Sequence, residues 1–567
     1  ADNFNRKSQS AEVGTTIQSA GSTTLQAGKD IKARAADVQS NANVVATAGG
    51  SVTIEAGVAT SAQSSGRTTA GSSFFASNLS TDRQSSSQTQ AVASNFGGNN
   101  VTVNSGKDIG IQASNVVADK DLTLAAAGNV TIEAGTNTQT QTSYSAKSES
   151  GLMSSGGLDV SIGNRDQSTD QMNTRTSAAA STVGSTGGNI TITAGKTYTQ
   201  TGSDVLATST TAGTGNIDIT AKKVDIVEAR ETSSSETKTK FEQSGITLSL
   251  SNPVVSAAQT MQKMATAADN TKSERMKALA AGNAALAGYG AYAAIDNGRS
   301  LKDATTVDKA GGVSINVSIG SSSSESSTSI SNDTARGSTT IAAGNVNITA
   351  KGAGTDSNLL VQGSTLSAGD TTNLRADNQV RLLAAANTSI QTSSNSGSNA
   401  SMGVGFSTGS KSGITINASV GKSQGSGNGQ DITYTNTQIN AGRQANITSG
   451  GDTALQGAVV AAQTVKADVG GNLSMETLQD KSTYSESSSS SGAGVSVCVP
   501  PLCYGTSSAN ISASKTDINS NYQSANEQTG IKAGDGGFQV RNIKCVSKPH
   551  NRRIGGAIQV HPYLQQP

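Results

Sequence analysis

Short stretches in which apolar and polar residues alternate recur along the whole chain. Each opens with Gly-Asn or a similar pair, followed by an apolar residue, a small polar residue and a second apolar residue. Because alternate side chains of an extended strand point to opposite faces, we expect Val130 and Ile132 to face one way and Thr131 the other. The copies lie at 128–132, 188–192, 215–219, 344–348 and 471–475, with near copies at 50–54 and 99–103.

The spacing of the turn glycines predicts how these strands assemble. Gly28 and Gly49 are 21 residues apart, and Gly450 and Gly470 are 20 apart. Three-residue strands are unstable alone, but stacked coils of roughly 20–22 residues can merge their apolar faces into one core, as in a parallel β-helix. We expect Gly and Asn at the corners to supply the positive φ of tight turns. The pattern therefore predicts an all-β fold, a right-handed parallel β-helix, or β-solenoid.

Ser/Thr-rich inserts separate the blocks of coils. Each combines a polar run with a strand of strict two-residue period, such as Gly245-Ile246-Thr247-Leu248. We expect these inserts to form extruded hairpins or edge strands with loose polar tips; flexible linkers are the alternative. They cover about residues 58–97, 136–186, 231–251, 313–338, 388–430 and 481–529.

One segment interrupts the β pattern. After Pro253, residues 257–295 become rich in Ala, Met, Lys and Leu. This composition predicts a helical insert, broken near Asn270, that caps or flanks the solenoid; a helix that binds a partner is the alternative. Its helix-forming positions include Met261, Met264, Ala268, Arg275, Leu279 and Leu286.

The end of the chain also changes character. After Asp535 there is no Asp or Glu, whereas five basic residues, both histidines and three of the six prolines appear. Because the change falls within a coil that begins at 536–540, we interpret residues 541–567 as an atypical basic tail produced by a shift of reading frame. A nucleic-acid-binding tail is the alternative.

The composition favours a solenoid over globular domains. Aromatic residues make up 3% of the chain and Trp is absent, so a globular core would be thin. Disorder is the alternative for so polar a chain, but the phased Val and Ile pairs argue against it. The 41 Lys and Arg balance the 40 Asp and Glu, so charge gives no attraction to nucleic acid or to an anionic membrane.

Neither end of the chain has the features of a complete secreted protein. Residues 1–7 contain no initiator Met and no signal peptide, which suggests a piece of something longer. No run of apolar residues reaches the 18 or so that a membrane-spanning helix needs.

The residue types present exclude most catalytic chemistry. Residues 1–549 contain no His, which removes His-dependent nucleophiles and His-rich metal sites. The acids stand singly at turns, as at Asp30, Asp108, Asp121 and Asp370, rather than in the convergent sets that β-helical carbohydrate enzymes use. Cys498 and Cys503 are close enough for a local disulfide, with two incidental thiols as the alternative. We therefore expect no catalytic, cofactor or metal site and no enzyme activity.

The coils resemble the repeats of filamentous hemagglutinins. The resemblance rests on TIQSAG at 16–21 and TLQAGKD at 24–30. It is closer still to the second repeat region of the contact-dependent growth-inhibition toxins, the CdiA family, because of the Ser-rich insert before 245–248 and the helical stretch at 261–280. The similarity covers about residues 10–540. It implies hemagglutinin-repeat β-helix at 10–252 and 301–540 with the helical insert at 253–300 between them, and it leaves the atypical basic tail at 541–567 outside.

This resemblance implies a secreted protein of the two-partner-secretion type, displayed as a fibre at the bacterial cell surface. Its implied partners are an outer-membrane transporter and a receptor on the target-cell envelope, with no nucleic acid and no small-molecule substrate. In the toxin branch, the repeat region helps to carry a C-terminal toxin into a target cell. A host-cell adhesin without toxin cargo is the alternative.

Overall fold

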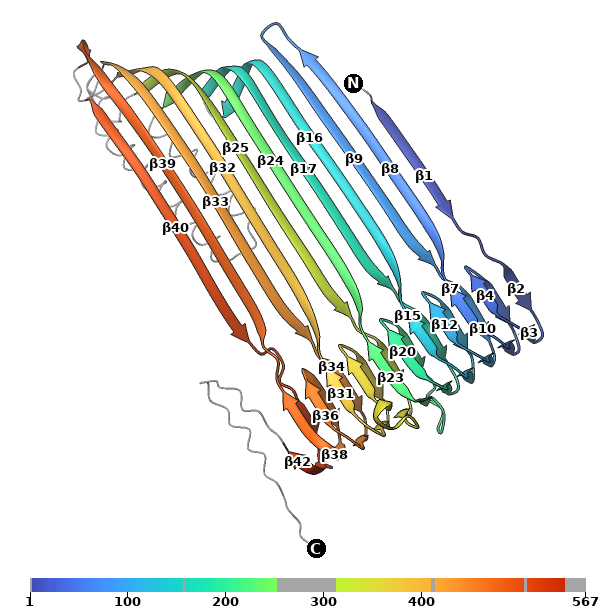
Figure 1. Cartoon of the computed structure of the whole chain (residues 1–567). Helices are drawn as coiled ribbons and strands as arrows, with labels where there is room; N and C mark the ends of the chain where they lie inside the picture. Colours follow the sequence, from blue (N-terminus) through green and yellow to red (C-terminus); the bar gives the residue numbers. More distant parts are fainter. Residues whose placement is uncertain (1–2, 157–158, 252–312, 409–412, 504–506, 546–567) are drawn as a thin grey trace, which may run out of the picture.

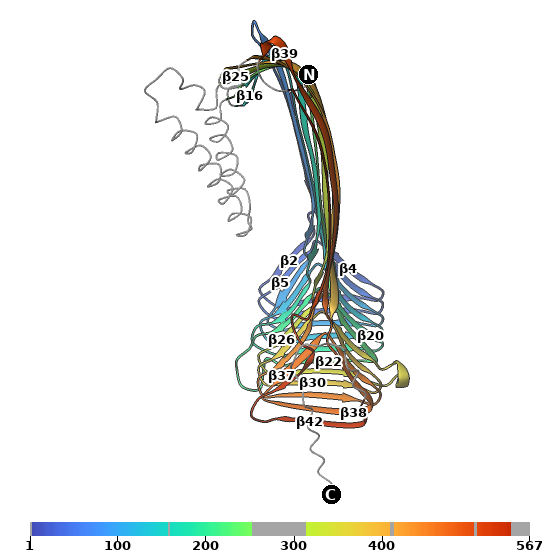
Figure 2. The same ribbon diagram turned by 90° about the vertical axis from the view of Figure 1, so that its left-hand side faces the viewer.

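The computed structural model describes residues 3–156, 159–251, 313–408, 413–503 and 507–545. These residues form two assemblies of strands, a three-sided parallel solenoid and a tall antiparallel sheet that extends from one of its corners (Figure 1). In the view of Figure 2 the sheet is a thin layer seen on edge, and the solenoid spreads out on both sides of its base.

The solenoid has one short strand per side in each coil, and eleven strands stack on its first side. The first side contains β2 (Thr16–Ser19), β5 (Asp37–Ser40), β10 (Asn95–Gly98), β13 (Asn115–Ala118), β18 (Thr182–Ser185), β21 (Asp204–Ala207), β26 (Thr339–Ala342), β29 (Thr365–Ala368), β34 (Thr437–Ala441), β37 (Ala458–Ala462) and β41 (Gly530–Ala533). The second side contains β3 (Thr23–Ala27), β6 (Val44–Ala48), β11 (Val101–Ser105), β14 (Leu122–Ala126), β19 (Ile190–Ala194), β22 (Ile217–Ala221), β27 (Val346–Ala350), β30 (Thr371–Ala376), β35 (Gln444–Ser449), β38 (Thr464–Glu476) and β42 (Phe538–Cys545).

The third side contains β4 (Ile31–Arg34), β7 (Val52–Glu55), β12 (Ile109–Gln112), β15 (Val130–Glu133), β20 (Thr197–Thr201), β23 (Lys223–Val227), β28 (Leu359–Gln362), β31 (Val380–Leu383) and β36 (Thr453–Gln456). The long strand β38 continues from the second side onto the third, where its second half pairs with β36. A short 3-10 turn, η1 (Gly354–Asp356), lies in the corner between β27 and β28. With about 4.8 Å between stacked strands, eleven coils span about 50 Å.

The core of the solenoid consists of vertical stacks of aliphatic side chains. Val44, Val101, Leu122, Ile190 and Ile217 lie in register on successive coils, and all are fully buried. The predicted alternation is confirmed, because Val130 and Ile132 are buried while Thr131 between them faces outward. Each coil thus contributes a narrow apolar stripe, and stacking joins the stripes into one core.

The predicted reason for glycine in the Gly-Asn pairs was wrong at most of the copies. Only Gly215 has a left-handed conformation, with φ of +76°, whereas Gly128 and Gly188 lie outside that region. Glycine is needed at Gly128 because a Cβ atom there would lie 2.4 Å from Oδ1 of Asp108 and 2.7 Å from the carbonyl oxygen of Lys107. The corner of one coil rests directly on the corner of the coil before it, which leaves no room for a side chain.

Left-handed residues occur instead at a different corner, which closes every second coil. It lies between the third side of one coil and the first side of the next, and Gly202, Gly363 and Gly457 occupy it with φ between +51° and +64°. Ala35 and Ala113 hold the equivalent positions with φ of +49° and +47°. In the alternate coils the chain leaves the solenoid at this corner instead of closing it.

At these open corners the chain forms the long hairpins of the antiparallel sheet. Its strands, in spatial order, are β1 (Phe4–Ala11), β8 (Gly57–Ser72), β9 (Ala76–Val92), β16 (Gly135–Gly156), β17 (Asp159–Ala179), β24 (Ala229–Ser251), β25 (Val313–Arg336), β32 (Ala385–Thr408), β33 (Gly413–Thr435), β39 (Asp480–Cys503) and β40 (Ser508–Ser524). The predicted hairpins are therefore confirmed, and the inserts at 231–251 and 313–338 prove to be the two strands of a single hairpin.

Two sequence predictions concern residues that the structure does not describe. The helical insert predicted at 253–300 falls within 252–312, which lies outside the described residues. Of the tail predicted at 541–567, the described part is the end of β42, which pairs in parallel with β38 as far as Cys545.

Candidate functional site

The antiparallel sheet, which we call the hairpin sheet, is the largest surface that the fold adds to the solenoid. One hairpin leaves after every second coil, so each pair of coils supplies two strands of the sheet. Two coils rise by about 9.6 Å, and two paired strands occupy the same distance at about 4.8 Å each. Because the two repeats match, hairpins far apart in the sequence meet edge to edge and form one continuous sheet (Figure 1).

Near the solenoid both faces of the hairpin sheet are mainly polar. Hydroxyl groups pair across neighbouring hairpins, with 2.9 Å between the Oγ atoms of Ser323 and Ser398. Within hairpins, Oγ of Ser490 lies 2.7 Å from Oγ of Ser514, and Thr239 Oγ1 is 2.7 Å from Ser326 Oγ. Since each strand is 16 to 24 residues long in every full hairpin, backbone hydrogen bonds hold this region together rather than a core.

The distal end of the hairpin sheet, far from the solenoid, has a different composition on one face. Cross-strand register places Ile162, Ile246, Ile319 and Met402 opposite one another on four successive strands. Apolar residues at neighbouring alternate positions extend this row into an apolar band, which crosses strands β16 to β39. The band consists of Leu152, Val160, Ile162, Ile246, Leu248, Ile315, Val317, Ile319, Met402, Val404, Phe406, Ile416, Val420, Val495 and Val497.

The apolar band is exposed, whereas the residues on the other face of the same strands are mainly small and polar. The side chains of the band are 38% to 62% exposed. The intervening residues on the other face include Thr247, Ser318, Gly320 and Gly403. The described strands stay paired to their distal ends, so this part of the hairpins is not loose, and in β16 to β39 it is not wholly polar.

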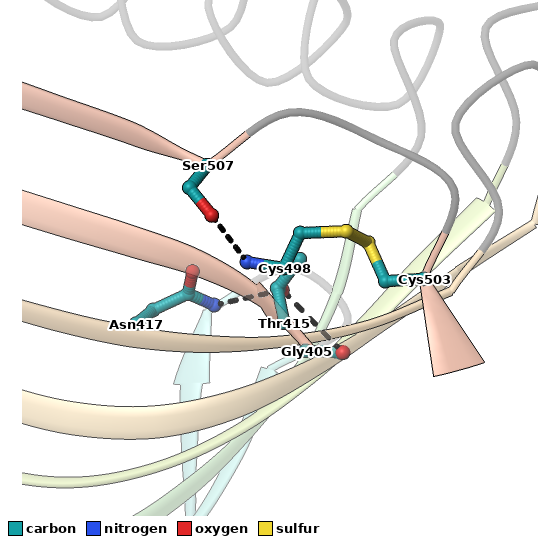
Figure 3. Close-up of a disulfide and its surroundings, with 6 residues drawn as sticks. All are labelled: Gly405, Thr415, Asn417, Cys498, Cys503 and Ser507. Atoms are coloured by element: carbon teal, nitrogen blue, oxygen red, sulfur yellow. Dashed lines mark hydrogen bonds between the residues drawn. A yellow bond between two sulfur atoms is a disulfide. The ribbon is translucent and has the colours of Figure 1, made fainter. Parts of the chain in front are cut away.

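Cys498 and Cys503 lie at this distal end, in β39, and a disulfide joins them (Figure 3). The backbone N–H of Cys498 donates a hydrogen bond of 3.0 Å to Oγ of Ser507, which directly precedes β40. The adjacent strand β33 places Thr415 opposite Cys498 and Gly413 opposite Cys503. The disulfide thus links two residues of β39 that are five positions apart, near the distal end of the last hairpin described.

The turn acids have structural roles, as their isolated positions suggest. Asp108 Oδ1 accepts a hydrogen bond of 2.7 Å from the backbone N–H of Asn129, one coil further on. Asp121 accepts the equivalent bond of 2.9 Å from Asn189. Asp370 pairs with Arg443 at 2.5 Å and 3.0 Å, and the hydrogen bond from this guanidinium lowers the pKa of the Asp370 carboxyl. Each acid therefore ties one coil to the next.

One ionic cluster fixes the start of the hairpin sheet to the solenoid. Arg34 donates to both oxygens of Glu12, at 2.7 Å and 2.9 Å, and to Glu55 at 3.1 Å. The hydrogen bond from Arg34 is the largest effect that lowers the pKa of Glu12, and Glu12 and Glu55 together raise the pKa of Arg34. Because Arg34 and Glu12 are 44% and 43% exposed, their ion pair positions β1 and contributes little free energy.

No grouping typical of catalysis or metal binding occurs among the described residues. They contain no cluster of three His, Cys, Asp or Glu side chains that could hold a metal ion. The depressions on the described surface are lined by residues such as Thr392, Asn428, Thr483 and Tyr484 rather than by paired carboxylates. Within the same residues, no helix has the length and apolarity needed to cross a membrane.

Sequence reasoning missed a buried polar network in the solenoid core. Tyr198 Oη donates to Oε1 of Gln200 at 3.0 Å, and Thr340 Oγ1 donates to the same oxygen at 3.0 Å. All three residues are fully buried, and burial raises the pKa of Tyr198. Gln200 lies in a stack between Ile132 and Ile226, so the apolar pattern alone gave no signal of it.

The apolar strands of the band, in contrast, could be recognised in the sequence. The inserts contain strict two-residue alternation at 246–250, 315–319 and 402–406. That pattern predicts strands with one apolar face. It does not reveal that strands from different hairpins align their apolar faces into one surface. That alignment depends on the match between the rise of two coils and the width of two paired strands.

Comparison with known proteins identifies similar chains. Residues 2–74, 75–222 and 317–493 match the protein family described as "Hemagglutinin repeat". The chain is 36% identical over 448 residues to "tRNA nuclease CdiA" of Escherichia coli strain STEC_O31, an alignment that covers 78% of this chain and 13% of that protein. It is 35% identical over 450 residues to "Toxin CdiA" of Escherichia coli, covering 78% of this chain and 14% of that protein.

A third relative is covered more fully. The chain is 38% identical over 446 residues to "Deoxyribonuclease CdiA" of Yersinia pseudotuberculosis serotype O:3 strain YPIII, covering 77% of this chain and 39% of that protein. The chain therefore spans between about an eighth and two fifths of the length of these relatives. No solved structure matches it.

Proposed function

Since this chain belongs to the hemagglutinin-repeat family, we propose that it is a structural and delivery segment of a secreted, toxin-carrying fibre of the CdiA type. The observation that carries the proposal is the alignment with toxin proteins over 77–78% of the chain. In this role the segment has no enzyme activity of its own, and the toxin lies in another part of the longer protein.

The geometry suits this work in two ways. Coils stacked in register form a rod of about 50 Å, which supplies reach without a large hydrophobic core. The hairpin sheet adds a broad surface on one side of the rod, with polar residues near the solenoid and apolar residues at its distal end. A repetitive chain of this kind can pass through a pore unfolded and then fold coil by coil outside.

The proposed partners follow from the same role. An outer-membrane transporter of the two-partner-secretion type exports the longer protein to the bacterial surface, and a receptor on the target-cell envelope captures it. Among the segments of that protein, we assign to this one the transfer of the toxin at the target envelope. Nucleic acids and small-molecule substrates have no role here.

A chimaera tests the proposal. In the Escherichia coli relative named Toxin CdiA, the matching 450 residues are either deleted or replaced by this chain, and growth inhibition of target cells is measured with surface display of the exoprotein as the control. We expect the deletion to keep display but lose inhibition, and the replacement to restore inhibition. A deletion protein that still inhibits, or a displayed chimaera that fails to inhibit, contradicts the proposal. If the displayed chimaera instead binds host cells without inhibiting bacteria, the adhesin function replaces it.

A further inference from the structure

The apolar band at the distal end of the hairpin sheet is a surface that neither the solenoid nor the described hairpins cover. Ile319 and Met402 at its centre are 61% and 62% exposed, although both lie in fully paired strands. Soluble proteins rarely expose a contiguous apolar surface of several hundred Å² unless another molecule covers it. The band therefore requires an occupant.

The size of the band matches that of a stable protein interface. It crosses seven strands at about 4.8 Å each, which gives about 34 Å, and up to three alternate positions along a strand, which gives at most about 20 Å. The resulting area of at most about 700 Å² approaches the roughly 800 Å² that each partner buries in a standard protein–protein interface.

The chemistry of the band suits a partner with the same surface. None of its fifteen residues is charged, and the first charged residues on this face, Asp166, Glu242 and Lys422, lie beyond its edge toward the solenoid. A surface without charge needs no complementary charge opposite it. Two such faces can therefore pack on each other at the usual distance of about 10 Å between sheets, as in a β-sandwich.

We propose that the apolar band is a homodimer interface, in which a second copy of this chain packs its own band face to face against the first. The contact is isologous, so each residue near the centre meets the corresponding region of its partner. Val317 and Val404, which lie opposite each other on β25 and β32, occupy that centre.

The shape of the molecule fixes the orientation of the two copies. The solenoid is broader than the sheet and extends on both sides of it (Figure 2). Two solenoids at the same end would collide before sheets about 10 Å apart could meet. The twofold axis therefore runs along the rows of the band, so that the solenoids lie at opposite ends and the two rods point in the same direction.

A lipid bilayer is the main competing occupant, and the band fits it less well. A strand that crosses a bilayer needs about 9–11 residues with an apolar face, whereas the band occupies about five residues of each strand. The face opposite the band is also polar, with Thr247 and Ser318 at its centre.

Sedimentation velocity of the full chain over a wide range of concentration tests the proposal. We expect the wild type to reach twice the 56.7 kDa mass of one chain. Val317→Asp should weaken dimerisation by about 100-fold, because it buries a charge without a partner in the interface. Ser318→Asp, the matched control on the opposite face of the same strand, should dimerise like the wild type.

A second experiment locates the contact. In a background with Cys545→Ser, Val404→Cys should form a covalent dimer on mild oxidation, because the twofold axis brings the two copies of this position together. Ser318→Cys, on the opposite face, should form no covalent dimer under the same conditions. Circular dichroism confirms that each variant retains its β structure.

The proposal is wrong if the wild type stays monomeric at every concentration, or if Ser318→Asp dissociates the dimer as strongly as Val317→Asp does. It is also wrong if the wild type is monomeric and the band binds vesicles of phosphatidylcholine and phosphatidylethanolamine, with Val317→Asp abolishing that binding. Lipid is then the occupant.

Discussion

The solenoid and the hairpin sheet use the same sequence pattern with opposite results. Ile190-Thr191-Ile192 in the solenoid and Ile246-Thr247-Leu248 in the hairpin sheet both alternate apolar and polar residues after a glycine. Ile192 is fully buried, whereas Ile246 is 48% exposed. Alternation determines which side chains share a face of a strand, but only closure of the coil determines whether that face is covered.

The two regions are also stabilised in different ways. In the solenoid, short strands bury side chains in a shared core, two in β15 and four in β30. In the hairpin sheet, long strands pair through their backbones and bury little. We therefore expect the solenoid to respond to changes in side-chain volume and the sheet to respond to changes in register.

The largest expected effect comes from removing core volume. Ile192→Ala should lower the free energy of unfolding by about 3–4 kcal/mol, because it leaves a cavity in a stack that cannot collapse. Chemical denaturation followed by circular dichroism measures this. Ile390→Ala is the matched control on the hairpin sheet, where the side chain is 46% exposed, and should cost less than about 1 kcal/mol. Equal losses in the two variants would remove the distinction between the regions.

The second largest loss of stability is expected at the corners of the solenoid. Gly128→Ala should cost about 2 kcal/mol, since its Cβ would meet the backbone carbonyl of Lys107 at 2.7 Å. Gly110→Ala, in the neighbouring strand β12, should be neutral because nothing lies within 4 Å of the added Cβ. Thermal unfolding of the two variants gives the difference. A neutral Gly128→Ala would show that the corners do not rest on one another.

A smaller effect is expected at the distal end of the hairpin sheet. Replacing Cys498 and Cys503 by Ser removes the cross-link of a short loop, which should cost about 2 kcal/mol by chain entropy. The loss should stay local, so hydrogen exchange should rise at the tip of β39 and remain unchanged in the solenoid. Mass spectrometry of the unreduced wild type first establishes that the disulfide is present. Faster exchange in β36 or β38 as well would mean that the two regions unfold as one unit.

The smallest effect should be stabilising. Ala113 has φ of +47°, a left-handed conformation that disfavours alanine, so Ala113→Gly should raise the free energy of unfolding by about 0.5–1 kcal/mol. Gly202→Ala, at the equivalent corner, should have the opposite sign, because its Cβ would lie 2.3 Å from Cβ of Ala229. Differential scanning calorimetry measures both. If Ala113→Gly destabilises the protein, the corner is not strained.

Local patterns predicted the strands well because the physics that forms them is local. The period of two at 130–132 and 190–192 identified which residues are buried, and coil spacing near 21 identified the solenoid. The role of Gly128 was predicted incorrectly because its constraint comes from Asp108 and Lys107 in the coil below. No local pattern contains that contact.

The assembly of the hairpin sheet likewise could not be predicted from local sequence patterns. Each insert was predicted as a hairpin from its own alternation, but the pairing of Ser323 with Ser398 joins two hairpins that are 75 residues apart. The two hairpins can pair because the rise of two coils equals the distance that two paired strands occupy. The buried Gln200 was not predictable either, since its partners Thr340 and Ser203 come from other coils or corners of the fold.

Hairpins from successive coil pairs join into one continuous sheet, and a cysteine cross-link between neighbouring hairpins is the decisive test of this arrangement. Ser323→Cys with Ser398→Cys, in a Cys545→Ser background, places two thiols where neighbouring hairpins pair. We expect this pair to form a disulfide rapidly within one chain under mild oxidation. Ser323→Cys with Ser394→Cys, four residues out of register, should react slowly. Equal rates for the two pairs would mean that the hairpins move independently and would contradict the account.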